Sequence, residues 1–160
     1  MDPITFRDDC VRPALEALNA WTTHAEMLVM GTAAVESGLK YTRQMGDGPA
    51  LGYFQMEPDT FNDCWTNYLD FRPVLKALVL CTRNGEGPPN AEEMVTDHKF
   101  AAAMCRVRYM RVPSAIPIEP KAMAGYWKQH YNTVHGKGDS HHFVASWNRL
   151  LAPALYARID

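Results

Sequence analysis

The stretch from residue 34 to residue 61 constrains the fold most, because it must end one helix and begin another. Apolar residues recur at helical spacing up to Glu36, and Gly38 is a natural place for that helix to end. The next segment, residues 40–57, contains too many helix breakers to continue it, namely Gly46, Gly48, Pro49 and Gly52. We therefore expect a helix with Glu36 in its last turn, followed by a short β-hairpin or an irregular loop.

Helix-start signals occur on both sides of this stretch. Thr23 and Glu26 have the spacing of a capping box, which places the start of the first helix there. Three prolines suit the first helical position. They predict helices over about 58–69, 73–81 and 120–131.

Two further segments are expected to be helical. One helix ends near Val112 and has a core face built from Phe100, Met104 and Val107. The last helix is expected over 141–156, with Asp139 or Ser140 as its cap. The sequence contains no repeat and no linker, so it predicts a single mainly α domain over residues 1–160.

Length and charge limit the classes of protein that this chain can belong to. At 160 residues it suits one domain with its own core. Its net charge of −2, from 16 Lys and Arg against 18 Asp and Glu, argues against nucleic acid or an anionic membrane as a partner. No apolar run approaches the roughly 20 residues of a membrane span. The start, MDPITFRDDC, lacks the basic and apolar regions of a secretory signal, so we expect synthesis in the cytoplasm and no membrane insertion.

The cysteines give no sign of a metal or redox site. Cys10, Cys64, Cys81 and Cys105 are widely spaced and form no CxxC pair. We expect each of them to be a small core residue on an apolar helix face. No metal and no cofactor is predicted.

Glu36 is the candidate catalytic residue. A glycosidase acid must keep its proton near neutral pH, and partial burial beside apolar groups raises the pKa of a glutamate toward that range. The apolar residues before it, over 30–35, can supply such surroundings. A carboxylate at the C-terminal, negative end of a helix dipole is mildly destabilising, which favours a functional reason for Glu36 at this position. The alternative is an ordinary solvated glutamate at a helix end.

Two motifs around Glu36 carry a family resemblance. Residues 36–39, ESGL, resemble the E-S-G-F/L element of soluble lytic transglycosylases and goose-type lysozymes. Residues 52–60, GYFQMEPDT, are similar to the G-L-M-Q-x-x-P-x-T element of the same proteins, in the same order and with a Gly-rich loop between. The clear match covers about 27 residues and most resembles the lysozyme-like muralytic proteins of tailed bacteriophages.

The resemblance implies a lysozyme-like fold and roles for the matched residues. Glu36 would be the catalytic general acid and base, and Ser37 would orient it or touch the substrate. Gln55, with the backbone around Tyr53 and Phe54, would line the groove for the glycan. The two aromatic rings replace Leu and Met of the commoner pattern, and they would be available for stacking on sugars, with core packing as the alternative.

Two tyrosines farther along the chain are also candidates. A third family element, a Tyr-Asn pair, is matched by Tyr131 and Asn132, which would sit across from Glu36. The usual Ala-Tyr-Asn-Ala-Gly is His-Tyr-Asn-Thr-Val here, over 130–134, and this departure leaves the role of the pair open. Related enzymes use a helical tyrosine near their acid, for which Tyr109 is the candidate, with core or rim packing as the alternative.

A hydrolase also needs a second carboxylate. Inversion places it about 6.5–9.5 Å from the acid, and retention places it at about 5–5.5 Å. Asp47, Glu57 and Asp59 are the candidates, and none is singled out by the sequence. A lytic transglycosylase needs only the one acid, because the 6-hydroxyl of its own substrate attacks.

Together these features predict an enzyme that cleaves the β-1,4 bond between N-acetylmuramic acid and N-acetylglucosamine. Its expected partners are peptidoglycan glycan strands and, from the bacteriophage resemblance, other virion proteins. It would act on the wall in the periplasm, delivered by the virion or through a holin. A different class stays open, namely a non-catalytic virion or cell-wall-binding module with the same fold, which would tolerate glutamine in place of Glu36.

Overall fold

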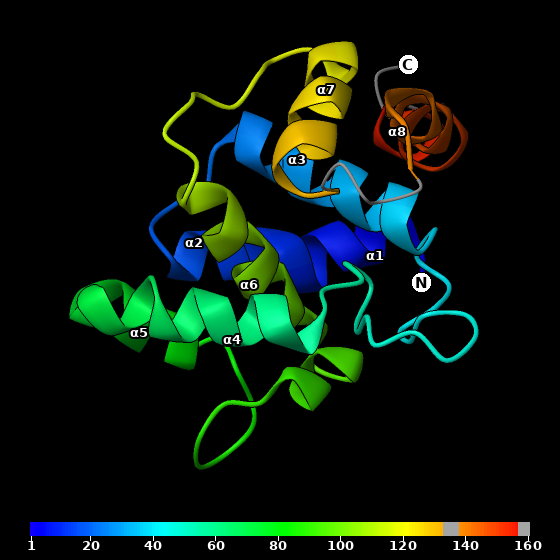
Figure 1. Cartoon of the computed structure of the whole chain (residues 1–160). Helices are drawn as coiled ribbons and strands as arrows, with labels where there is room; N and C mark the ends of the chain where they lie inside the picture. The colour runs from blue at the N-terminus through cyan, green and yellow to red at the C-terminus, as the bar shows by residue number, and fades with distance from the viewer. Residues whose placement is uncertain (133–137, 157–160) are drawn as a thin grey trace.

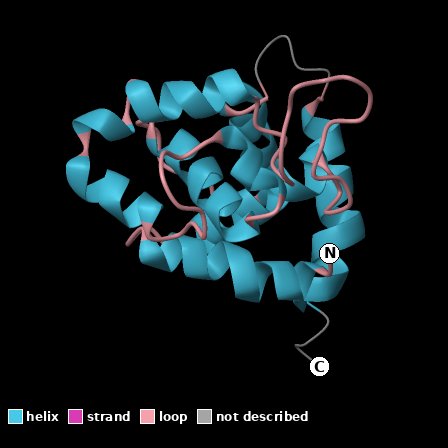
Figure 2. Ribbon diagram, turned by 90° about the horizontal axis from the view of Figure 1, so that it is seen from below, coloured by secondary structure: helices cyan, strands magenta, loops and turns pink. Residues whose placement is uncertain are grey.

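The computed structural model describes residues 1–132 and 138–156 (Figure 1). The protein is mainly helical, as predicted, and within those ranges it has no strand (Figure 2). Residues 40–57 form an irregular loop, in which isolated antiparallel bridges join Leu51 to Arg43 and to Met56. None of the helices in the described ranges is long and apolar enough to cross a membrane.

Helix α3 (Thr23–Glu36) lies at the centre of the molecule and is buried over most of its length. It contacts α6 (His98–Met110), α7 (Pro120–His130) and α8 (Ser140–Ser146). A helix that is apolar on all sides belongs in a core, which agrees with this position. Because α3 is held on several sides, its C-terminal residue, Glu36, has a defined place in the fold.

The prolines begin helices where the sequence predicts them. The helices α4 (Pro58–Thr66), α5 (Pro73–Leu80) and α7 each carry proline in the first turn, where its missing N–H has no helical partner to lose. The predicted core face of α6 is confirmed, since Phe100, Met104 and Val107 are fully buried. These boundaries depend on local chemistry, which is why the sequence predicts them well.

The C-terminal helical segment is also confirmed. Helix α8, the π-helical turn η4 (Trp147–Leu151) and α9 (Ala152–Tyr156) follow one another without a break. Asp139 is the N-cap, and its carboxylate accepts a hydrogen bond of 3.0 Å from the backbone N–H of His142.

The N-terminal segment, for which no helix is predicted from the sequence, is also helical. It consists of α1 (Pro3–Phe6), the π-helical turn η1 (Arg7–Val11) and α2 (Arg12–Ala17). Phe6, Val11 and Leu15 are fully buried, and η1 and α2 pack against α6. Two 3₁₀ turns, η2 (Leu69–Phe71) and η3 (Ala91–Val95), complete the described elements.

The capping box expected from Thr23 and Glu26 does not form. The cap of α3 is Thr22, whose hydroxyl accepts from the N–H of Ala25 at 3.0 Å. Glu26 does not close a capping box, because its carboxylate binds the stronger donors of Arg12 and Trp21, each at 2.7 Å.

The cysteines follow the expectation with one exception. Cys10, Cys64 and Cys105 are buried, whereas Cys81 is exposed. Cys81 is the C-cap residue of α5, just beyond the apolar face of that helix, so it is a surface residue.

Candidate functional site

A cleft of about 960 Å³ opens at the C-terminal end of α3. Its walls come from the end of α3, the 40–57 loop, the start of α4, the last turn of α6, the end of α7 and the turn η4. The cleft therefore gathers segments from most of the chain around one helix end. Five of the predicted site residues line it, namely Glu36, Ser37, Gln55, Tyr131 and Asn132.

Glu36 has the electrostatic environment of a proton donor. It is partly buried, and burial raises its pKa from 4.5 to about 7. The indole N–H of Trp127 donates to Glu36 Oε1 at 2.9 Å, and this hydrogen bond lowers the pKa. Arg108, Asn132 and Lys128 act in the same downward direction, but burial outweighs them. A carboxyl group with a pKa of about 7 can both give and take a proton near neutral pH.

Ser37 ties the end of α3 to the loop that follows. Its hydroxyl lies 2.7 Å from the carbonyl oxygen of Tyr53 and 3.1 Å from that of Ala33, and it accepts from the N–H of Leu39 at 3.3 Å. The side chain is buried and its bonding capacity is used within the protein. Of the two roles that the resemblance implies, the geometry fits positioning of the helix end.

Gln55 lines the cleft with an unusual backbone conformation. Its φ is 46°, in the left-handed region that non-glycine residues seldom adopt. Its side-chain N–H donates to the carbonyl oxygen of Gly52 at 2.9 Å, which holds the amide in place beside the cleft. Strain of this kind persists where the surrounding structure supports it, often at functional sites.

Tyr53 and Phe54 contribute their backbone and not their rings. The Tyr53 ring packs against His98 and Phe6, at centroid distances of 4.5 and 5.4 Å, and Phe54 is 1% exposed. Neither ring lines the cleft, so of the two alternatives for these rings the structure has core packing. Their side chains fill the core under the loop, and this leaves their carbonyl oxygens to bond the cleft residues.

Tyr131 and Asn132 lie at the end of α7, in the wall of the cleft. The hydroxyl of Tyr131 donates to the carbonyl oxygen of Phe54 at 2.9 Å, which joins α7 to the 40–57 loop. The guanidinium of Arg108 lies 4.4 Å from the centre of the Tyr131 ring. Asn132 accepts from Lys128 at 3.0 Å. The two residues after this pair, 133–134, where the sequence departs from the family pattern, lie outside the described residues.

Tyr109 lies in the core, away from the cleft. It is 1% exposed, and its hydroxyl is 2.7 Å from the hydroxyl of Thr32. Its ring centroid is 5.4 Å from that of Tyr131, so it supports the cleft wall from behind. Of the two alternatives for Tyr109, the structure has core packing.

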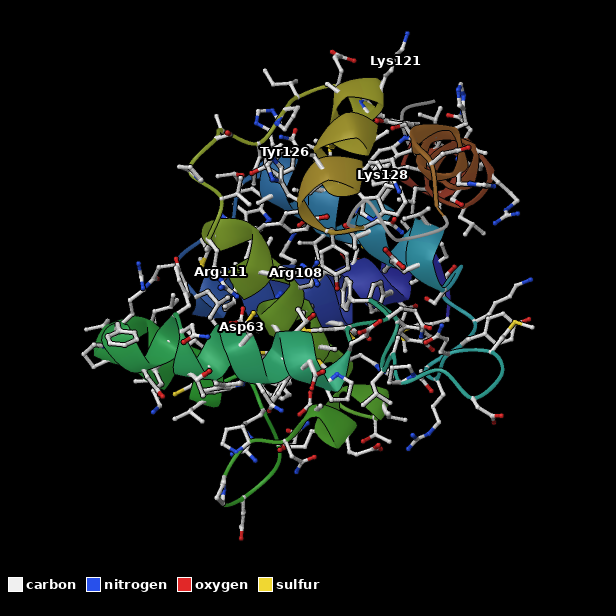
Figure 3. The ribbon with its side chains drawn as sticks, viewed as in Figure 1. Asp63, Arg108, Arg111, Lys121, Tyr126 and Lys128 are labelled. Atoms are coloured by element: carbon white, nitrogen blue, oxygen red, sulfur yellow. The ribbon has the colours of Figure 1, made fainter. Side chains whose placement is uncertain are left out.

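Sequence reasoning missed three residues of the site. Trp127 bonds Glu36, Arg108 lines the cleft above Tyr131, and Tyr41 lines the cleft with 49% of its surface exposed. Figure 3 shows Arg108 on α6 and Lys128 on α7 on the same face of the molecule. Trp127 precedes Tyr131 by four residues, and this spacing on a helix could have signalled a shared face.

The three candidate second carboxylates are separated by the fold. Glu57 lines the cleft, whereas Asp47 and Asp59 are not part of its wall. Within the described ranges no group of three or more His, Cys, Asp or Glu side chains could hold a metal ion.

Comparisons with protein-family models, with curated proteins and with solved structures find no match for this chain. The two motifs and the geometry of the cleft are therefore the features that bear on function.

Proposed function

We propose that this protein is a lysozyme-like enzyme that cleaves the β-1,4 bond between N-acetylmuramic acid and N-acetylglucosamine in peptidoglycan. The observation that carries the proposal is Glu36, a carboxyl group in a cleft of about 960 Å³ whose pKa burial raises to about 7. Helix, loop and turn segments form the walls of the cleft, and its volume is in the range of ligand-binding sites. Its position between the ESGL and GYFQ motifs adds support.

The proposed first step is a proton transfer from Glu36. Protonated Glu36 donates to the glycosidic oxygen as the bond from that oxygen to the sugar C1 breaks, and the sugar becomes cationic. Ionised Glu36 then stabilises the positive charge and accepts a proton from the attacking hydroxyl. Trp127 N–H holds the carboxylate in this second state, because its hydrogen bond favours the charged form.

Two nucleophiles are compatible with this scheme. If the 6-hydroxyl of the muramic sugar attacks C1, its proton passes to Glu36 and a 1,6-anhydro end forms, as in a lytic transglycosylase. If water attacks, the product has a reducing end, as in a lysozyme. Glu57 lines the cleft, and this favours it over Asp47 and Asp59 as a base for that water.

The route to the wall is part of the proposal. By its resemblance to phage muralytic proteins, the enzyme would be delivered by a virion, in company with other virion proteins, or through a holin.

The test compares the protein with its Glu36→Gln variant on purified Gram-negative peptidoglycan, with released muropeptides identified by mass spectrometry. Anhydro-muropeptides from the wild type alone would support a lytic transglycosylase, and reducing ends a lysozyme. A Glu57→Gln variant distinguishes these two reactions further. It would abolish hydrolysis that uses Glu57 as the base for water, and it would leave transglycosylation unchanged. If neither the wild type nor Glu36→Gln releases sugar but both sediment with the wall, the non-catalytic binding module replaces the enzyme.

A further inference from the structure

The cleft gathers cationic side chains, although the chain as a whole has a net charge of −2. Its walls carry four of them, Lys40, Arg43, Arg108 and Arg149. The carboxyl groups in the same walls are Glu36 and Glu57, and burial raises the pKa of Glu36 to about 7, which reduces its negative charge near neutral pH. The cleft is thus electropositive, and an anionic ligand would be drawn to it.

Two of these cations have roles within the protein. Arg43 forms an ion pair with Glu92 at 2.6 Å. Arg108 donates to the carbonyl oxygen of Tyr131 and lies over its ring. These two side chains are held in place by the fold, so they are not the first candidates for contact with a ligand.

Lys40 and Arg149 are different. In the described part of the chain, neither side chain takes part in an ion pair or a hydrogen bond. Both are exposed, and they come from different elements. Lys40 follows the end of α3, and Arg149 lies on η4, which packs against α3. The two charges therefore stand in the cleft that contains Glu36 and are free to bind a ligand.

A neutral β-1,4-linked glycan has no anion for such cations. Peptidoglycan differs because peptides with free carboxylates are attached to its muramic residues. We propose that Lys40 and Arg149 bind carboxylates of these stem peptides, so that the cleft selects peptide-bearing strands over bare glycan. This inference rests on the proposed function and adds to it a preference for strands that carry stem peptides.

The experiment measures binding and not turnover. The Glu36→Gln background prevents cleavage, and the first probe is soluble peptidoglycan strands with their stem peptides. The second probe is the same strands after removal of the peptides by an amidase and conversion of the lactyl carboxylates that this exposes to neutral methyl amides. We expect the background protein to bind peptide-bearing strands more tightly. Adding Lys40→Gln and Arg149→Gln should weaken that binding about tenfold and leave binding to bare strands unchanged. Higher salt should reduce the preference, because exposed charges are screened.

Two further variants serve as controls. Lys40→Arg with Arg149→Lys keeps both charges and should retain the preference. Lys99→Gln with Lys121→Gln removes two cations that do not line the cleft, and it should change neither affinity. Lys121 lies at the far end of α7 (Figure 3). Thermal unfolding of each variant shows whether it is folded.

The outcomes separate the inference from the proposed function. If the background protein binds both strands equally, or if the glutamine pair weakens both by the same factor, the stem-peptide inference is wrong while the glycan-cleaving function stands. If the background protein binds neither strand, both are wrong.

Discussion

At the scale of single residues, the site is defined by what surrounds Glu36. Burial raises its pKa to about 7, and the Trp127 indole works against that shift. A carboxyl group balanced in this way can act as an acid and then as a base within one reaction. The pKa depends on burial and on several neighbouring side chains, so it can be shifted by changing one of them.

The Trp127→Phe variant should shift the pH dependence of activity. It removes the N–H that stabilises ionised Glu36, so the pKa of Glu36 rises above its present value of about 7. Because the first step needs protonated Glu36, kcat/KM should begin to fall at a higher pH, by about one unit. A pH profile measures this. The control is Trp65→Phe, since the indole N–H of Trp65 has no partner among the described residues; an equal shift in both variants would contradict the role of Trp127.

Glu36→Gln should stabilise the protein above neutral pH. The folded-state pKa of about 7 exceeds the ordinary 4.5, so the folded protein binds the extra proton and loses stability as pH rises between these values. At pH 8 the wild type keeps an ionised carboxylate partly buried, and the glutamine does not. We expect the variant to gain about 2 kcal/mol in free energy of unfolding at pH 8 and much less at pH 4.5. Urea unfolding at both pH values measures this, and a pH-independent gain would argue against a raised pKa.

At the scale of the elements, the site depends on how closely α8 approaches α3. A Cβ atom at Gly31 would lie 2.3 Å from Cζ of Phe143, so only glycine allows the present contact. The same packing brings η4, with its cleft residue Arg149, against α3. One glycine in a buried helix thereby fixes the distance between two walls of the cleft.

The Gly31→Ala variant should lower the free energy of unfolding by roughly 1–3 kcal/mol, because the added methyl group forces Phe143 to move. Gly125→Ala is a matched control. Gly125 is also helical, but nothing lies within 4 Å of an added Cβ atom, so alanine should be neutral or stabilise by up to about 1 kcal/mol. Chemical denaturation of both variants measures the difference. Equal effects would show that helix propensity decides, and not the contact with Phe143.

At the scale of the whole molecule, the first helices support the cleft from the far side of the core. Phe6 is fully buried and packs against Tyr53 and Phe54, with ring centroids 5.4 and 5.9 Å apart. The carbonyl oxygens of these two residues bind Ser37 and Tyr131. The N-terminus of the chain is therefore linked to the walls of the site through one aromatic cluster.

Phe6→Ala should destabilise the protein by about 3–5 kcal/mol, the range for loss of a buried phenylalanine. It should also reduce the rate of glycan cleavage under conditions where the variant is still folded, because the 40–57 loop loses its support. Denaturation gives the first quantity, and turnover at low temperature gives the second. An unchanged rate in the folded variant would show that the loop is held independently of Phe6.

What the sequence alone determined is local. Proline at helix starts, Asp139 at a cap and breakers after Gly38 act within a few residues, so the helices and the end of α3 at Glu36 could be predicted. What only the tertiary structure decided depends on residues far apart in the chain. Trp127 reaches Glu36 across 91 positions, and the rings of Tyr53 and Phe54 turn into the core because Phe6 is there. The pKa of a group depends on all the contacts around it, many of them distant in the chain. For that reason the motif indicated a candidate acid, while the fold determined its pKa.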